Sequence, residues 1–324
     1  MCCAYQCRLT QAAMVLAASK SDADAFLVIL GDVLISLPVQ DFIDDWLATK
    51  QNVGVVVHPS THPRDSDAVF EAHDGTVRVI PKGTDRRAMP NMSSAGLFAV
   101  TRAATELYGE FKDVGSNVLA AAASDADLFP YVSSRYLKDT GTSSRLQPAE
   151  QDVAIGVPAR RGSTSPRGAL FLDRDGVINP RIPEVYRPED FSLLPGVGQA
   201  IGQANRQGIP VVVITNQPGI AKGFMSWEQH EAIRAQMDEL LSDSGAFVDD
   251  YLFCPHHPDA GFPGELPDLK GECNCRKPAS DLGRIAAFRH GLDLTKSVMV
   301  GDTERDRGFA RALGMTFVCV EDGP

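Results

Sequence analysis

The chain has 324 residues, 44% of them hydrophobic, which is enough for a globular protein with two hydrophobic cores. Its 42 acidic and 31 basic residues give a net charge of -11, which opposes binding to a phosphate polymer, so we expect no nucleic-acid partner. No stretch approaches the ~20 apolar residues of a membrane span, and no signal-peptide pattern is present, so we expect a cytoplasmic protein without a membrane partner.

Apolar runs alternate with helical patterns in the first half of the chain, which predicts an α/β domain over residues 1–146. No internal repeat or low-complexity tract is present in the sequence. The expected strands are Ala25–Leu30, Val53–Val57 and Leu97–Val100, and the expected helices are Val39–Lys50 and Ser116–Ala123.

The stretch of residues 147–167 differs in composition from the segments on either side. It contains Pro148, Pro158 and Pro166, two glycines and a polar run of Arg, Ser and Thr. It shows no sustained apolar periodicity, so we expect a linker between two domains.

The last part of the chain, residues 168–324, has short apolar runs without polar alternation, as in strands that are buried on both faces. A helical pattern runs from Ser226 to about Leu241, with Gln229 at the spacing of a capping box. This alternation predicts a parallel sheet with helices on both faces, in which ligands bind at the carboxyl ends of the strands. The expected strands are Ala169–Leu172, Pro210–Ile214, Val298–Val300 and Thr316–Val320.

Polar side chains follow three of these strands directly. Asp173 and Asp175 come after the first, although such a pair by itself is a weak signal because loop aspartates usually cap turns or face water. Thr215 follows the second strand, Asp302 follows the third, and Lys277 lies between them in an Arg-Lys-Pro segment. We therefore expect these five residues to meet at one site.

This set of residue types is suited to phosphoryl transfer. Asp173 can attack phosphorus to form an aspartyl phosphate, and Asp175 can protonate the leaving alkoxide and then deprotonate water. Mg²⁺ held by Asp173, Asp302 and the carbonyl oxygen of Asp175 would neutralise the phosphoryl charge, together with the Lys277 ammonium and the Thr215 hydroxyl. The residues predict magnesium-dependent hydrolysis of a phosphomonoester.

The motifs that carry these residues resemble the four motifs of the haloacid dehalogenase (HAD) superfamily of phosphatases. They are Asp173-Arg-Asp-Gly-Val, Thr215, Lys277 and Val-Gly-Asp302-Thr-Glu-Arg-Asp306, in this order. The resemblance covers residues 168–324 and implies a Rossmann-like fold with the roles given above. Asp306 is either a further metal-site carboxylate or a charge at a helix N-terminus.

A second cluster lies between the second and third motifs. Cys254, His256, Cys273 and Cys275 offer three thiolates and an imidazole, a complete tetrahedral set for structural Zn²⁺. Free buried cysteines are the alternative, but thiols in a polar segment rich in Pro and Gly have no core to fill. Zinc would fix Cys275 and thereby the adjacent Arg-Lys pair, whereas we expect His257 to be a solvated loop residue.

Within this fold, the pattern Cys-x-His…Cys-x-Cys-Arg-Lys-Pro resembles two phosphatase families, which act on D,D-heptose 1,7-bisphosphate and on histidinol phosphate. The segment Thr215-Asn-Gln-Pro-Gly-Ile-Ala-Lys222-Gly and the 16 residues between His256 and Cys273 favour the heptose family. The resemblance implies two residues in contact with the sugar and two that bind phosphate: Asn216 and Gln217, and Lys222 and Arg276.

Two positions depart from the pattern of the heptose family. Lys222 stands where arginine is usual, which replaces a bidentate fork with a point charge, and Thr303 stands where lysine is common. Both changes affect the grip on the phosphate that is not cleaved. The two departures therefore concern the identity of the substrate and not the type of reaction.

The first half of the chain resembles the later part of a sugar-1-phosphate nucleotidyltransferase. By this resemblance Asp32 and Asp139 would hold magnesium and Lys82 would meet a sugar phosphate. The glycine-rich loop of that family is absent, so the phosphates of a nucleotide lack a backbone cradle. We expect a truncated domain that transfers no nucleotide and that self-associates through an exposed strand edge.

The motifs and resemblances together predict a phosphatase for a small phosphorylated sugar. The predicted reaction removes the C7 phosphate of D-glycero-D-manno-heptose 1,7-bisphosphate. One alternative is a histidinol-phosphate phosphatase, and another is a sugar-phosphate-binding scaffold derived from a nucleotidyltransferase.

Overall fold

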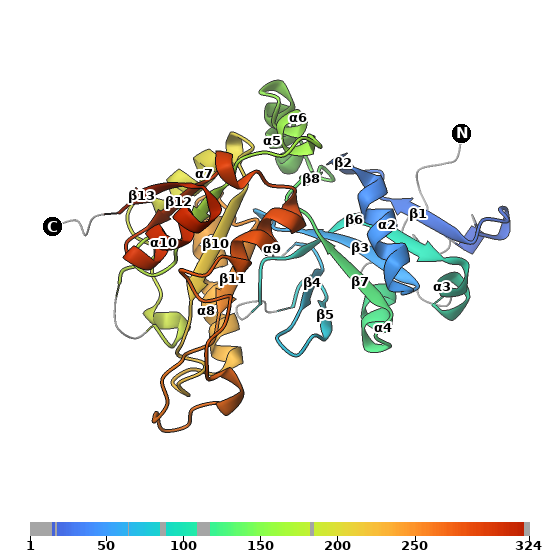
Figure 1. The fold of residues 1–324 in the computed structure, drawn as a ribbon. Coiled ribbons are helices and arrows are strands. Elements are labelled where there is room, and N and C mark those ends of the chain that lie inside the picture. The colour runs from blue at the N-terminus through green and yellow to red at the C-terminus, as the bar shows by residue number, and fades with distance from the viewer. Residues whose placement is uncertain are drawn as a thin grey trace. The chain divides into compact units, whose positions relative to one another are not determined.

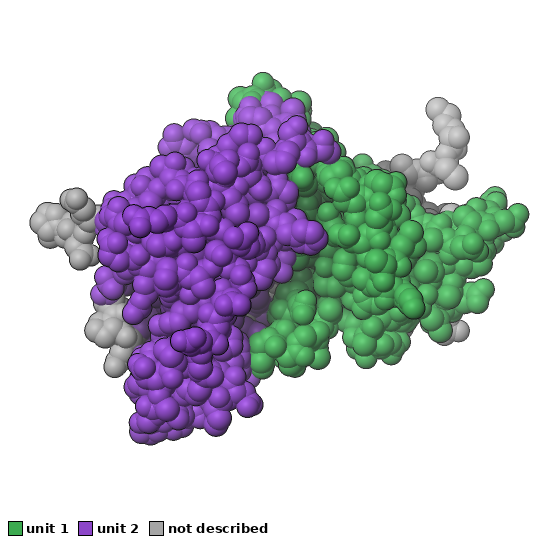
Figure 2. Space-filling view, in the orientation of Figure 1, with its two compact units in different colours: residues 1–58, 62–85, 92–155 green, residues 59–61, 86–91, 156–324 purple. Residues whose placement is uncertain are grey.

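The computed structural model describes residues 15–16, 18–63, 65–84, 89–108, 117–181 and 185–320. The chain divides into two compact units, which Figure 2 shows in different colours. No helix among the described residues is long and apolar enough to cross a lipid bilayer. The first unit comprises Met1–His58, His62–Asp85 and Met92–Ile155, and the second comprises Pro59–Thr61, Arg86–Asn91 and Gly156–Pro324.

The first unit is built on a six-stranded mixed sheet in the order β5-β4-β6-β3-β7, with β1 also paired to β6 (Figure 1). β7 runs parallel to β3, whereas β6 is antiparallel to β1, β3 and β4. A separate antiparallel ladder joins β2 (Val33–Ser36) to β8 (Tyr136–Asp139). The strands of the main sheet are β1 (Ala25–Ile29), β3 (Val53–His58), β4 (Ala68–Glu71), β5 (Val77–Ile80), β6 (Ser93–Thr101) and β7 (Leu128–Val132).

Helix α2 (Val39–Thr49) packs its apolar side against this sheet. Phe42 is fully buried and Trp46 is almost so, in one core with Leu97 of β6. A Cβ atom on Gly54 of β3 would lie 2.9 Å from the Trp46 ring, so the helix can approach the strand this closely because residue 54 is glycine.

The elements expected in the first half are present with small shifts in their bounds. The three predicted strands correspond to β1, β3 and β6, and the first predicted helix to α2. The second corresponds to α4 (Leu119–Ser124), while Ser116 lies outside the described residues. An additional short helix, α3 (Arg102–Leu107), is capped by the Thr101 hydroxyl, which accepts a hydrogen bond from the Ala104 amide.

The second unit contains a five-stranded sheet in the order β11-β10-β9-β12-β13, and every strand pair in it is parallel. This confirms the predicted parallel sheet, and it adds β11, which the sequence pattern did not reveal. The strands are β9 (Leu170–Leu172), β10 (Val211–Asn216), β11 (Asp250–Cys254), β12 (Val298–Gly301) and β13 (Thr316–Cys319).

Helices cover both faces of this sheet, as the buried strands require. Leu172 of β9 lies in a core with side chains of α7 (Val197–Arg206) and α8 (Trp227–Asp243). Phe171, the preceding residue, lies in a second core with side chains of α9 (Asp281–His290) and α10 (Glu304–Leu313). Successive residues of a strand point to opposite faces, so β9 contributes to both cores.

The expected linker, residues 147–167, is not an irregular segment, and this prediction is corrected. It contains most of α5 (Ser143–Ala154) and all of α6 (Val157–Gly162). The polar composition of this segment did not predict the two helices, because ionic contacts contribute to their packing and they show no sustained apolar periodicity. Arg161 of α6 is buried against the fully buried Asp249, with Nη1 2.7 Å from Oδ1, and α6 belongs to the second unit.

Candidate active site

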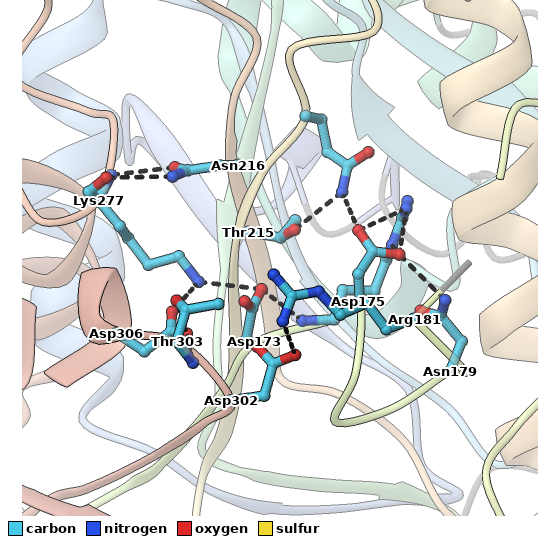
Figure 3. Close-up of polar contacts among 12 residues, drawn as sticks. Asp173, Asp175, Asn179, Arg181, Thr215, Asn216, Lys277, Asp302, Thr303 and Asp306 are labelled. Carbon is cyan, nitrogen blue, oxygen red and sulfur yellow. Dashed lines mark hydrogen bonds and ion pairs between the residues drawn. The ribbon is translucent and has the colours of Figure 1, made fainter. Parts of the chain in front are cut away.

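The carboxyl ends of β9, β10 and β12 bring the predicted polar residues to one edge of the parallel sheet (Figure 3). Asp173 follows β9, Thr215 is the second-to-last residue of β10, and Asp302 follows β12. Lys277 reaches the same place from the segment before α9, and its ammonium contacts Asp173. The strand register therefore assembles side chains that are up to 129 positions apart in sequence.

Lys277 is held between two carboxylates. Its Nζ atom lies 2.9 Å from Oδ1 of Asp173 and 2.6 Å from Oδ1 of Asp306, and its side chain is 2% exposed. The other oxygen of Asp306 accepts hydrogen bonds from the amide and the hydroxyl of Thr303, and the bond from the amide is one half of the capping box of α10. Asp306 is thus a counter-ion for Lys277 and a helix cap, since both of its oxygen atoms are engaged.

The carboxylates of Asp173 and Asp302 are suited to a divalent cation. Burial raises the pKa of Asp173 to about 6, although the neighbouring Lys277 ammonium acts in the opposite direction. Asp302 has a buried Oδ1 atom without a hydrogen bond, and one oxygen atom each of Asp302, Asp173 and Asp306 lie within 4.8 Å of one another. Mg²⁺ prefers oxygen ligands of this kind, so the residues fit the predicted ion.

The backbone conformation and the surroundings of residue 176 explain why the first motif contains glycine there. The φ angle of Gly176 is +86°, and a Cβ atom there would lie 2.1 Å from Oδ2 of Asp302. Any other residue would displace the Asp302 carboxylate from its position. The turn after β9 therefore supplies space for a carboxylate that follows β12.

Asp175 is surrounded by hydrogen-bond donors. Nη2 of Arg174 lies 2.8 Å and 2.9 Å from its two oxygen atoms, and the amides of Asn179 and Gln217 donate at 3.0 Å and 2.8 Å. Burial alone would raise the pKa of Asp175, but the Arg174 guanidinium and the two amides outweigh that effect and lower it. The structure therefore holds Asp175 as a carboxylate.

Arg174 and Asn179 were missed as site residues by sequence reasoning. Arg174 is 2% exposed although it lies in a loop, and its position between two aspartates was the available signal. Asn179 carries no such signal, because its contact with Asp175 depends on the turn that Gly176 makes. Both residues position a predicted catalytic group.

Asn216 and Gln217 have partners within the protein. Oδ1 of Asn216 accepts from the Lys277 amide at 2.9 Å, and its Nδ2 donates to the Lys277 carbonyl at 3.1 Å. Gln217 is 5% exposed and donates to Thr215 as well as to Asp175. These contacts position Lys277 and Asp175, while contact of either amide with the sugar stays a prediction.

The four predicted zinc ligands lie together beside β11. Sγ of Cys254 is 3.5 Å from Sγ of Cys273, 3.2 Å from Sγ of Cys275 and 3.6 Å from Nδ1 of His256. Ligand atoms around a tetrahedral zinc ion are separated by roughly 3.5–3.8 Å, given bond lengths of about 2.0–2.3 Å. The four side chains therefore lie close enough together to hold a metal ion, and zinc stays the predicted one.

Phe262, in the loop between the zinc ligands, has two cationic side chains over its ring. Nζ of Lys222 lies 4.7 Å and Nζ of Lys270 lies 4.8 Å from the ring centre. Next to the zinc ligands, Nη1 of Arg276 donates to the His256 carbonyl at 3.1 Å. His257 packs edge-on against the same ring and is 8% exposed, so the expectation of a solvated histidine was wrong. Burial, together with the charges of Lys222 and Arg276, lowers the pKa of His257.

Comparison with known proteins identifies similar phosphatases. A family model described as "HAD-hyrolase-like" matches residues 274–324. A D-glycero-D-manno-heptose-1,7-bisphosphate 7-phosphatase from Thermosynechococcus vestitus is 39% identical over 161 residues, which are 49% of this chain and 81% of that protein. The corresponding β-anomer phosphatase from Mesorhizobium japonicum is 40% identical over 48% of this chain and 70% of that protein.

A solved structure is also similar in sequence. It is a D,D-heptose 1,7-bisphosphate phosphatase from B. bronchiseptica complexed with magnesium and phosphate, with 35% identity, a TM-score of 0.41 and coverage of 46% of this chain and 78% of that one. The curated relatives are matched over most of their own length. The chain therefore belongs to the family of HAD-like phosphatases that contains these heptose bisphosphate 7-phosphatases.

Proposed function

We propose that this phosphatase removes the C7 phosphate of D-glycero-D-manno-heptose 1,7-bisphosphate through an aspartyl-phosphate intermediate. The observation that carries the proposed chemistry is the meeting of Asp173, Asp302 and Lys277 at one edge of the parallel sheet. The choice of sugar is supported by the relatives, which bear the name of this reaction.

Asp173 is the proposed nucleophile. Its carboxylate lies next to the Lys277 ammonium, which offsets its charge in the resting site. During attack the same ammonium can stabilise the negative charge on the phosphoryl oxygens. Thr215 is 1% exposed at the end of β10, where its hydroxyl can bind a phosphoryl oxygen. Attack forms the bond between the Asp173 oxygen and phosphorus and breaks the bond between phosphorus and the sugar oxygen.

Asp175 is the proposed acid and base. As an acid it must carry a proton, yet in this structure its two oxygens accept from Arg174, Asn179 and Gln217. The carboxyl group must therefore turn away from these donors to protonate the leaving sugar oxygen. The resulting Asp175 carboxylate can then deprotonate the water that attacks the aspartyl phosphate, and Asp175 thereby regains its proton.

Magnesium would be held by Asp173, Asp302 and the carbonyl oxygen of Asp175. When bound, it would stabilise the negative charge of the transferring phosphoryl group. The residues of the chain supply the nucleophile, the proton transfers and the ammonium. The proposed sites for both metals rest on the donor sets described above.

Zinc would be held by Cys254, His256, Cys273 and Cys275 in a closed structural site. Cys275 is two residues before Lys277, so the site would restrain the approach of the lysine to Asp173. We expect about one zinc ion per chain by metal analysis, and Cys273→Ser should lower zinc content and kcat together. A Cys273→Ser variant with unchanged zinc content and kcat would contradict the proposed site.

Lys222 and Arg276 are proposed to bind the phosphate that is not cleaved. The Lys222 ammonium faces the Phe262 ring, and both cations lie close enough to His257 to lower its pKa. A second phosphate distinguishes the heptose substrate from histidinol phosphate, which has one. Measurement of kcat/KM with magnesium on heptose bisphosphate, histidinol phosphate and fructose bisphosphate should give the highest value for the first. A higher value for histidinol phosphate would contradict the proposed substrate.

The first unit is proposed to transfer no nucleotide. Asp32 and Asp139 do meet, since a Cβ atom on Gly141 would lie 2.7 Å from one and 3.1 Å from the other. However, Asp139 accepts from the Gly141 amide and is paired with Arg145, which also pairs with Asp65, so the oxygen atoms of Asp139 already have partners in this unit. Incubation with GTP and heptose 1-phosphate should yield no GDP-heptose, and a clear GTP-dependent product would contradict this proposal.

The nucleotidyltransferase-like character of residues 1–146, a sugar-phosphate-binding role for Lys82 and a cytoplasmic location stay predictions. Self-association through the first unit is supported by exposed apolar side chains on β1. Leu27 is 39% exposed and Ile29 is 52% exposed, and β1 pairs with β6 alone among the described strands.

A further inference from the structure

Arg181 lies beside the metal-binding carboxylates but belongs to none of the sequence motifs. Its Nη1 atom is 3.2 Å from Oδ2 of Asp302 (Figure 3). The Arg181 side chain is 56% exposed, whereas that of Asp302 is 4% exposed. Lys277 is engaged with Asp173 and Asp306, so within the described part of the chain Arg181 is the cation paired with Asp302.

Arg181 and a divalent cation would compete for the same carboxylate. One oxygen of Asp302 makes no hydrogen bond and the other pairs with Arg181. The backbone at Gly176 packs against Oδ2, which restricts the movement of the carboxylate. A metal ion that binds Asp302 therefore weakens its pairing with Arg181, because both cations need the same small anionic surface.

The charges of the site indicate where the displaced guanidinium goes. Asp173, Asp302 and Asp306 face two cations, Lys277 and Arg181, which leaves one negative charge in excess. A divalent ion in place of Arg181 makes this cluster neutral. A phosphate group then adds about two negative charges, and a long, exposed arginine at the rim can offset one of them with a bidentate contact.

We propose that Arg181 changes partner during the reaction cycle. It pairs with Asp302 before the metal binds, and after the metal has displaced it, it binds an oxygen of the substrate phosphate. This inference rests on the proposed magnesium-dependent function and adds a phosphate-binding residue to it. Arg181 also tunes the affinity for the metal, since removal of its charge removes a competitor.

Titration of Mg²⁺ alone into the full chain by calorimetry tests the competition. Arg181→Gln should tighten Mg²⁺ binding about two- to fivefold, the effect of losing a partly exposed ion pair. Arg187→Gln is the matched control, because Arg187 is an exposed arginine nearby in sequence whose partner is Asp190. It should leave Mg²⁺ affinity unchanged, and Asp302→Asn should abolish binding at this site.

Titration of inorganic phosphate into the magnesium-saturated protein tests the exchange. Arg181→Gln should weaken phosphate binding about tenfold, and Arg181→Lys should weaken it less, since lysine keeps the charge but not the fork. Equal Mg²⁺ affinity in Arg181→Gln and wild type would overturn the competition, and equal phosphate affinity would overturn the exchange. Neither titration uses a heptose, so failure of heptose bisphosphate as a substrate would leave both results standing. Absence of Mg²⁺ binding in the wild type would instead overturn the proposed function.

Discussion

Asp173 and Asp175 have different proposed tasks, and an activated substrate separates them. p-Nitrophenolate leaves without protonation, so Asp175→Asn should still form the aspartyl phosphate but hydrolyse it about 10²- to 10⁴-fold more slowly. The expected result is a burst of about one p-nitrophenolate per site followed by slow turnover, measured by stopped-flow absorbance. Asp173→Asn should give neither burst nor turnover. Steady turnover without a burst in Asp175→Asn would contradict the two roles.

Asn216 is a positioning residue for Lys277, because its amide bonds both the N–H and the C=O of that residue. Asn216→Asp keeps the acceptor but places an oxygen against the Lys277 carbonyl at the position of the present donor. We expect kcat/KM to fall about 30- to 100-fold, and Asn216→Ala to cost about tenfold, from the loss of one or two hydrogen bonds. Zinc content and melting temperature, measured alongside, should change little. A higher KM with unchanged kcat would instead favour a contact between Asn216 and the sugar.

At the scale of elements, the start of β11 is tied to the end of α9 by a buried ionic contact. Asp250 accepts from His290 at 2.8 Å and from Arg289 at 2.9 Å. Burial would raise the pKa of Asp250, but the hydrogen bond from His290 and the positive charges of Arg289 and Arg234 lower it from 3.8 to about 2. The contact therefore stabilises the packing of this helix on this strand in its ionised form.

A lowered pKa in the folded state sets the sign of the pH effect. The stabilisation is complete above about pH 5, and it is lost as the pH falls through 3.8 towards 2, by about 2 kcal/mol in total. Asp250→Asn should remove this part of the acid sensitivity. The difference in unfolding free energy between wild type and Asp250→Asn, measured from pH 6 to pH 2.5, should shrink as the pH falls. Zinc loss affects both proteins and cancels in the difference, and a constant difference would contradict the assignment.

At the scale of the whole molecule, the boundary of the phosphatase unit lies before α6 and not at residue 168. Arg161 is 4% exposed and pairs through two nitrogen atoms with Asp249, which is fully buried and also accepts from the Val211 amide of β10. A chain that begins at residue 168 would leave the Asp249 charge buried without its partner. We therefore expect the phosphatase unit to need the chain from Gly156 onward for its stability.

Arg161→Leu in the full chain tests this boundary. Breaking a buried pair on one side costs about 3–5 kcal/mol, so the phosphatase unit should unfold at clearly lower urea concentration. Arg160→Leu is the matched control, because the neighbouring arginine is exposed and bonds the Gln207 carbonyl. Residues 156–324 should be more stable than residues 168–324 by a similar amount. Equal stability of the two chains would place the boundary at 168 after all.

The sequence by itself determined the elements whose signal is local. Buried strands appear as short apolar runs, and the capping box at Ser226 and Gln229 marks the start of α8, as observed. Asp173, Thr215 and Asp302 stand at the carboxyl ends of three predicted strands. Their positions were enough to predict that they meet, because the ends of parallel strands share one edge of a sheet. The four predicted zinc ligands, which lie within 22 residues of one another, were also recognisable from the sequence.

Tertiary structure decided everything that depends on a partner distant in sequence. Helix α6 is polar and rich in arginine, so its place became visible only with Asp249, which lies 88 residues away. The second bond of Asn216 to Lys277 spans 61 residues, and the pairing of Arg181 with Asp302 joins two loops that no motif connects. Apolar periodicity reports burial one element at a time, whereas ion pairs and amide contacts depend on which elements the folded sheet brings together.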